Sequence, residues 1–236
     1  MDTIREQILS NIITRLGEIR PANGFNTDCG ADVVRARKNL DPDELPALAV
    51  WPGQEESARQ YGNDIRTMPI QVEALALFAD ENPSVLSEKM LGDLIECMCG
   101  ITWTLPFTSG GPFQIQAGHL IEGNDSGAVG YVAGVTLASG AWETGDAAGT
   151  LTLRRLKGDF QAETLKVGAE EDAAATNGDI TGESAVETAT GGLADQIEYA
   201  GGGADEYPEA GEETVGCPAL FKITYHTLSG DPYTQP

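Results

Sequence analysis

The stretch from Asp64 to Gly100 constrains the fold most, because a long strand pattern passes directly into a helix pattern there. Alternating apolar residues between Ile65 and Phe78 predict one β-strand with one face in the core. Leu75 and Leu77 make the second face apolar too, so we expect the far end to be buried on both sides. Pro69 cannot donate to a sheet, which places the near end at an edge or a bulge.

A helix follows this strand. Asn82 is suited to the N-cap and Pro83 to the first helical position. Apolar residues then recur at helical spacing, at Leu86, Met90, Leu91, Leu94, Ile95 and Met98. A strand that turns straight into an amphipathic helix is the nucleus of a layered fold. The stretch has no evident catalytic group, which favours a structural protein.

The residues before this stretch predict a helix and two strands. Isoleucine and leucine recur at helical spacing between Ile4 and Ile19, and Pro21 is expected to end that helix. Strands are predicted over Ala31–Lys38 and Leu45–Trp51, and the polar run Gln54–Gly62 is predicted to be a loop. Short connections favour an α+β fold, with a mixed, largely antiparallel sheet and helices packed on it.

After Gly100 the composition becomes rich in Gly, Thr and Ala, with short alternating apolar runs between glycine-rich turns. This pattern is typical of a small all-β domain, and we expect one to be inserted at residues 104–191. Within it, Ala169–Thr190 has almost no large apolar side chain, so residues 169–190 are predicted to be irregular, acidic and partly mobile.

From Gly192 the sequence returns to the helix and strand patterns that are typical of residues 1–103. Tyr199–Gly211 is predicted to be a turn-rich connector, and Leu220–Thr227 alternates as a closing strand. The sequence therefore predicts one discontinuous α/β domain, formed by residues 1–103 and 192–236, that surrounds the inserted domain.

The net charge of −23 argues against nucleic acid as a direct ligand, because phosphate binding needs clustered Lys and Arg. The four cysteines lack metal-ligand spacing and are expected to be reduced thiols. The N-terminus lacks the order of a signal peptide, and no apolar run is long enough to cross a membrane. We therefore expect a soluble protein made in a reducing cytosol.

No motif for catalysis, cofactor binding or metal binding stands out. Gly201–Gly203 lacks the spacing of a nucleotide-binding loop, and neither His119 nor His226 has a nucleophile nearby in the sequence. Glu170–Asp172 with Asn177–Asp179 does not match a calcium loop. We therefore predict no enzyme, no cofactor and no metal.

Several stretches resemble bacteriophage tail terminator proteins of the lambda type, also called minor tail or tail completion proteins. In the N-terminal part they are Leu45–Val50, Met68–Glu73 and the helix around Asp93-Leu94. In the C-terminal part they are Gly192–Tyr199, Tyr207–Gly211, Phe221–Tyr225 and Gly230–Tyr233. The resemblance covers the two outer segments; the insert departs from simple family members and has a weaker likeness to β-modules of other phage structural proteins.

The resemblance implies a homo-oligomeric ring, expected to be a hexamer, at the head-proximal end of the phage tail. Such a ring ends polymerisation of the tail tube protein and forms the interface to head-completion or connector proteins. DNA passes through it without being bound specifically, and no membrane is involved. The expected place is the virion tail, after assembly in the host cytoplasm.

A closed ring needs two different complementary patches on each subunit. The residues that we expect at subunit or partner interfaces are Arg35, Arg37, Lys38, Tyr207, Glu209, Asp231 and Tyr233. The insert is expected to project outside the ring.

Two alternatives remain open. The chain could be another phage neck or decoration protein, with the inserted β-domain as its binding module. It could also be a hydrolase that uses a carboxylate pair in that domain.

Overall fold

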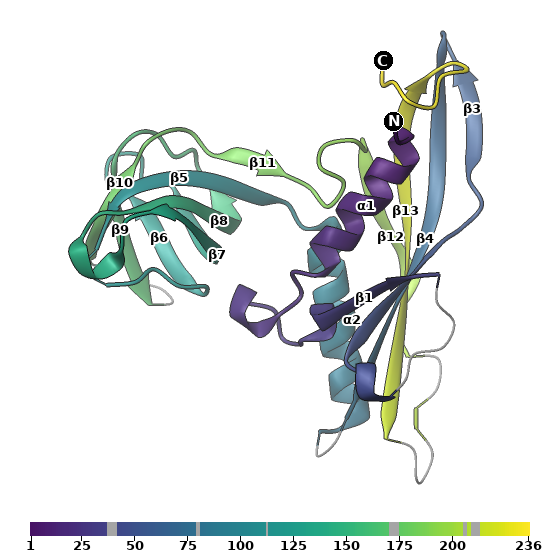
Figure 1. The fold of residues 1–236 in the computed structure, drawn as a ribbon, viewed down its shortest axis with the longest axis horizontal. Helices are drawn as coiled ribbons and strands as arrows, with labels where there is room; N and C mark the ends of the chain where they lie inside the picture. The colour runs from purple at the N-terminus through teal and green to yellow at the C-terminus, as the bar shows by residue number, and fades with distance from the viewer. Residues whose placement is uncertain (37–41, 79–80, 112, 170–174, 205–206, 209–212) are drawn as a thin grey trace. The chain divides into compact units, whose positions relative to one another are not determined.

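The computed structural model describes residues 1–36, 42–78, 81–111, 113–169, 175–204, 207–208 and 213–236 (Figure 1). The fold is mixed α/β, and strands account for 47% of it. The chain divides into two compact units. Unit 1 consists of Met1–Pro21, Phe25–Gly100 and Thr188–Pro236, and unit 2 of Ala22–Gly24 and Ile101–Glu187. Each unit has its own hydrophobic core.

Unit 1 is built on one six-stranded sheet. Its strands are β1 (Asp32–Arg35), β2 (Ala47–Pro52), β3 (Glu56–Gln60), β4 (Asn63–Leu77), β12 (Gln196–Gly202) and β13 (Thr214–Leu228). The order is β1-β2-β4-β13-β12, and β3 pairs with the part of β4 that β2 leaves free. Only β1 and β2 are parallel neighbours, which confirms the prediction of a largely antiparallel sheet.

The two α-helices of the described chain, α1 (Ile4–Leu16) and α2 (Pro83–Cys99), belong to unit 1 and lie on the same side of its sheet in Figure 1. The Asn82 side chain caps α2 by accepting from the backbone N–H of Ser84, as the sequence predicted. The helical stripe of Leu86, Met90, Leu94 and Met98 is buried against the inward face of the sheet. Burial of this stripe holds the layer together.

Short 3-10 turns connect the first elements: η1 (Pro21–Asn23), η2 (Cys29–Ala31) and η3 (Pro42–Glu44). The first helix ends at Leu16 rather than at Pro21, although Ile19 is still buried in the core. The first strand is shorter than predicted, because β1 ends at Arg35.

The described part of unit 2 is built mainly of strands and also contains the 3-10 turn η4 (Trp142–Thr144). The strands are β5 (Thr102–Gly110), β6 (His119–Gly123), β7 (Val129–Ser139), β8 (Ala147–Lys157), β9 (Thr164–Ala169), β10 (Ala175–Ile180) and β11 (Ala185–Glu187). They run in the order β10-β9-β6-β7-β8-β5, and a β10–β5 pairing closes them into a six-stranded barrel. The barrel is filled by side chains such as Leu105, Phe107, Leu151 and Leu165.

Two segments predicted to lack regular structure are strands. The predicted loop Gln54–Gly62 is wrong, because β3 forms a hairpin with β4 there. Every residue of β3 is exposed, so it has no apolar period to detect. The prediction for Ala169–Thr190 is wrong over β10 and β11; β10 closes the barrel mainly through backbone pairing, with Ile180 as its buried apolar anchor. Residues 170–174 lie outside the described part.

The prediction for the long strand Ile65–Phe78, which is β4 in the structure, needs two corrections. The far end of β4 is not buried on both sides, because Leu77 is 45% exposed and Leu75 is half-buried. Pro69 is not at an edge, since β4 is central and pairs with β13 along its whole length. Pro69 lies where β2 pairing ends and β3 pairing begins, so its missing N–H interrupts neither ladder.

The prediction of a turn-rich connector over Tyr199–Gly211 is wrong at its start. Strand β12 continues to Gly202, with an irregularity between Tyr199 and Gly201. The closing strand is confirmed, but it begins at Thr214 and is longer than the pattern indicated.

Candidate assembly surfaces

Arg35 ends β1 at one edge of the unit 1 sheet. Its Nη1 lies 2.6 Å from Oε1 of Glu6 on α1, and both side chains are partly exposed. The Arg35 guanidinium lowers the pKa of Glu6. One ion pair does not exhaust the donors of a guanidinium, so the outer part of Arg35 still presents positive charge at this edge.

The other described interface candidates lie elsewhere in unit 1. Tyr207 is 52% exposed, and its hydroxyl accepts from Ser84 Oγ at 3.3 Å, at the start of α2. Asp231 and Tyr233 share the C-terminal turn, where Tyr233 N–H donates to Asp231 Oδ1 at 2.9 Å and lowers the pKa of that carboxyl. The turn is tied to α1, because Ile4 N–H donates to the Pro232 carbonyl.

The structure therefore brings together only Asp231 and Tyr233 among these candidates. Arg37, Lys38 and Glu209 lie outside the described residues. Whether any of the candidates binds a partner stays a prediction.

Sequence reasoning missed a polar network at the hairpin end of the sheet. Glu55 precedes β3 and lies 3.0 Å from Nη1 of Arg66 on β4. Its other oxygen accepts from the Tyr225 hydroxyl on β13, and burial together with this carboxylate raises the pKa of Tyr225. Arg5 reaches the same carboxylate from α1 at 3.8 Å. The network therefore fixes the hairpin to the rest of unit 1.

A second set of bonds fixes the tip of the hairpin. Asp64 accepts from Ser229 Oγ at 3.0 Å and from the Gly230 N–H, and it pairs with Arg59 at 3.5 Å. The bond from Ser229 is the main cause of the lowered pKa of Asp64. The Ser229 N–H also donates to the carbonyl of Gly62 in the turn. These contacts hold the turn in one place.

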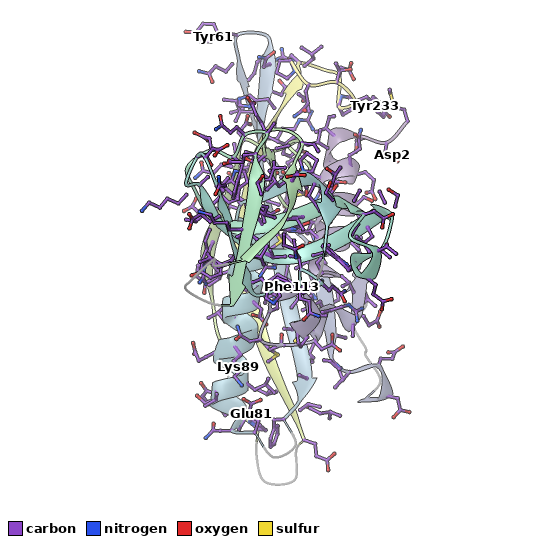
Figure 2. The ribbon with its side chains drawn as sticks, turned by 90° about the vertical axis from the view of Figure 1, so that its left-hand side faces the viewer. Asp2, Tyr61, Glu81, Lys89, Phe113 and Tyr233 are labelled. Carbon is purple, nitrogen blue, oxygen red and sulfur yellow. The ribbon has the colours of Figure 1, made fainter. Side chains whose placement is uncertain are left out.

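Tyr61 stands at the apex of this hairpin, where its side chain points away from the molecule (Figure 2). It is 99% exposed, and its φ of 50° with that of Gly62 at 91° gives a two-residue turn with both residues in the left-handed region. Asn or Gly is favoured at the first of these positions, and a bulky residue there is strained. Gly62 was the one residue of this turn whose type favours a turn in the sequence.

On one face of the unit 1 sheet lies none of the described helices of that unit. The register places the side chains of Leu75, Leu77 and Leu220 on this face, opposite in direction to the buried Ala74, Ala76 and Phe221. Polar side chains lie among them, including Glu73, Lys222 and Glu198. The uncovered face therefore carries partly exposed leucines among charged side chains.

The sheet also has two different free edges. Among the described strands, β1 pairs only with β2 and β12 only with β13, so no described strand lies on the other side of either one. Free edges are sites at which further strands add. Sequence patterns alone did not identify which strands would lie at the edges.

Each unit contains a buried carboxylate that accepts hydrogen bonds from a loop. Asp93 of α2 is 1% exposed and accepts from the backbone and side chain of both Asn26 and Thr27, at 2.7 to 3.0 Å. It fixes the chain between α1 and β1. The donors satisfy both oxygens, so the role of Asp93 is to position backbone rather than to perform chemistry.

Glu163 is the counterpart in unit 2 and is 6% exposed. Burial raises its pKa, but bonds from Ser126 Oγ and from the N–H groups of Ser126, Asp125 and Gln161 outweigh this and leave the pKa lowered. It therefore holds the β6–β7 turn as an ionised side chain.

No group of three or more His, Cys, Asp or Glu could hold a metal ion in the part of the chain that the structure describes. All four cysteines are free; Cys29, Cys97 and Cys217 are buried, and Cys99 is half-buried. Burial raises the pKa of Cys29 to about 11, which makes its thiol unreactive at neutral pH. Among the described helices, none is long and apolar enough to cross a membrane.

No protein-family model matches the chain, and no curated protein matches it.

Proposed function

We propose that the chain is a phage tail terminator: a virion structural protein whose unit 1 assembles into a ring, ends polymerisation of the tail tube and meets the head-completion proteins. The ring is a hexamer, and the protein has no catalytic role. DNA passes through the ring without a specific contact.

The observation that carries the proposal is where the resembling stretches lie. Leu45–Val50 falls on β2, Met68–Glu73 on β4, and Asp93-Leu94 on α2. In the C-terminal part, Gly192–Tyr199 overlaps β12 and Phe221–Tyr225 lies on β13. Residues that are far apart in the sequence thus form one sheet and its covering helix within one compact unit. A chance likeness of short patterns has no reason to converge on one structural unit.

Charge supports the same function. The net charge is −23, and acidic residues exceed basic ones in both units. A channel for DNA requires walls that do not hold phosphate, and a strongly acidic subunit supplies them. The free edges and the uncovered sheet face of unit 1 supply surface for neighbours.

Unit 2 is, in this proposal, an inserted all-β domain that folds by itself and projects from the outside of the ring. Its core is made of its own side chains, and six of its strands close on themselves. The same observation favours the second candidate, a neck or decoration protein in which this domain is the binding module. Joining unit 1 across residues 101–187 with a short Gly/Ser linker separates the two: retained rings support the terminator, and lost assembly supports the second candidate.

The proposal is tested with a phage tail tube protein that polymerises in vitro. The purified chain is added while that protein polymerises, and tube lengths and ends are measured by electron microscopy. Short tubes with a ring at one end are expected. Unchanged lengths, with no density added at the ends, contradict the proposal. The linked unit 1 serves as the matched variant, because it keeps the sheet but lacks the barrel.

A further inference from the structure

We propose that Asn23 is a site of spontaneous deamidation in the folded protein, and that the fold protects the other asparagine of the same sequence type, Asn177. Two asparagines of the chain are followed by glycine, in the pairs Asn23-Gly24 and Asn177-Gly178. The sequence alone makes both pairs reactive, and their surroundings in the structure separate them. Deamidation at Asn23 is independent of the proposed ring.

The reaction uses two groups of the chain, and water is its only other reactant. The backbone nitrogen of Gly24 attacks Cγ of the Asn23 side chain and gives up its proton. The bond from Cγ to Nδ2 breaks, and ammonia leaves with that proton, so that a five-membered succinimide ring remains. Water then adds to either carbonyl carbon and opens the ring, which gives aspartate or isoaspartate. Each event adds one carboxylate to the chain.

Ring closure requires the backbone nitrogen to approach Cγ in an attack geometry that ordinary backbone conformations do not provide. A side chain on the following residue crowds this approach, whereas glycine has no Cβ and turns freely. The surroundings then decide whether the peptide can make the turn. A pair in an open turn reacts, and a pair held by its neighbours does not.

The turn that contains Asn23 is open. Asn23 ends η1, which has no buried residue, and the following Gly24 is exposed. Gly24 has a φ of 81°, in the left-handed region. Apart from its chain neighbours, the nearest heavy atom to a Cβ built on Gly24 is Nη1 of Arg154, at 4.0 Å. The end of an arginine side chain can move aside, so the peptide has room to rotate.

The surroundings of Asn177 on β10 are closed. Asn177 is 1% exposed, and its side-chain amide is held on both sides. Its Oδ1 accepts from the Gly111 N–H at 2.6 Å, and its Nδ2 donates to the Phe113 carbonyl at 2.7 Å. A Cβ built on Gly178 would lie 3.0 Å from the carbonyl oxygen of Thr108. Ring closure here would break buried hydrogen bonds and push against the backbone of β5.

The products at Asn23 change the chain just before a fixed point. Phe25 is 5% exposed in the unit 1 core, and the backbone N–H groups of Asn26 and Thr27 donate to Asp93. Isoaspartate routes the main chain through one additional carbon atom, two residues before Phe25. The connection between α1 and β1 therefore gains a negative charge and an altered backbone as the protein ages.

Peptide mass mapping of the full chain tests the assignment. The protein is incubated at mildly alkaline pH, folded and in urea, and an isoaspartate-specific methyltransferase marks the second product. In the folded chain, Asn23 is expected to react about tenfold faster than Asn177 or more, a difference of about 1.4 kcal/mol in barrier height. In urea the two sites are expected to react at similar rates, since both precede glycine. Equal rates in the folded chain, or faster reaction at Asn177, overturn the proposal.

Two variants check that the assigned atoms react. Asn23→Gln lengthens the side chain, so that ring closure needs a less favourable six-membered ring, and product at this position is expected to disappear. Gly24→Ala adds the crowding Cβ and is expected to slow reaction at Asn23 in urea by about tenfold, where the strain of a left-handed alanine plays no part. The rate at Asn177 in the same samples is the internal control. An unchanged rate at residue 23 in either variant contradicts the succinimide route.

Discussion

The two units treat the edges of a β-sheet in opposite ways. In unit 2, the pairing of β10 with β5 closes the sheet, so that six strands share one interior filled with side chains. In unit 1, the described strands form an open sheet: β1 and β12 each have one described strand neighbour, and both described helices cover the same face. A closed sheet satisfies its backbone within itself, whereas an open one leaves it available to neighbours. The proposed function therefore assigns assembly to unit 1, whose sheet stays open, rather than to the closed sheet of unit 2.

The largest expected effects come from charges placed in the two cores. Leu94→Asp in unit 1 and Leu151→Asp in unit 2 each put an unpaired carboxylate among fully buried side chains, at a cost of about 3 to 5 kcal/mol. Because each unit has its own core, Leu94→Asp is expected to remove the helical circular dichroism, and Leu151→Asp to leave it intact. Loss of helix in both variants would show that the units do not fold separately.

Ile95→Asp sharpens this test. Ile95 neighbours Leu94 on α2 but is only half-buried, because the helix turns it away from the centre of the core. The expected loss is therefore smaller than for Leu94→Asp, and it is measured by urea unfolding of the same preparation.

Asp93→Ala is expected to destabilise unit 1 by about 2 to 4 kcal/mol, because it leaves donors of Asn26 and Thr27 without their acceptor. Glu88→Ala on the exposed side of the same helix is the control and is expected to change stability by less than about 0.5 kcal/mol. The free energy of unfolding is measured for both. Equal values would mean that the loop before β1 does not depend on Asp93.

Glu163→Gln tests the corresponding carboxylate of unit 2 by its pH dependence. The pKa of Glu163 is lower in the folded than in the unfolded chain, so its contribution is present above the unfolded value, about 4.3, and is lost as pH falls through the folded value. We expect the variant to be less stable at pH 7 and to lose less further stability on acidification. Asp146, whose pKa is also lowered, keeps part of the acid response. Parallel pH profiles for variant and wild type would contradict this role.

The smallest effect is expected at the hairpin apex. Tyr61→Asn replaces a strained aromatic with a residue suited to the turn, so the isolated chain is expected to gain about 0.5 to 1 kcal/mol. Tyr61→Phe keeps the strain and is expected to leave stability unchanged. A destabilised Tyr61→Asn would mean that the ring of Tyr61 contributes to folding despite its exposure.

The sequence predicted those parts of the fold in which apolar periodicity records burial. The helix from Pro83 and the strand through Ile70 and Val72 are examples. It missed β3 and β10, because their positions depend on backbone pairing with β4, β5 and β9 rather than on an apolar face. The hydrogen bonds of Asp93 join residues more than 60 positions apart. No local pattern encodes such contacts, and the same holds for which strands become the sheet edges.

Native mass spectrometry of the purified full chain tests the central proposal most directly, because it counts the copies in the proposed ring. We predict one dominant closed oligomer, at six times the 24.9 kDa mass of the chain, with no series of larger species. A monomer at all concentrations, or an open-ended ladder of oligomers, would contradict a ring.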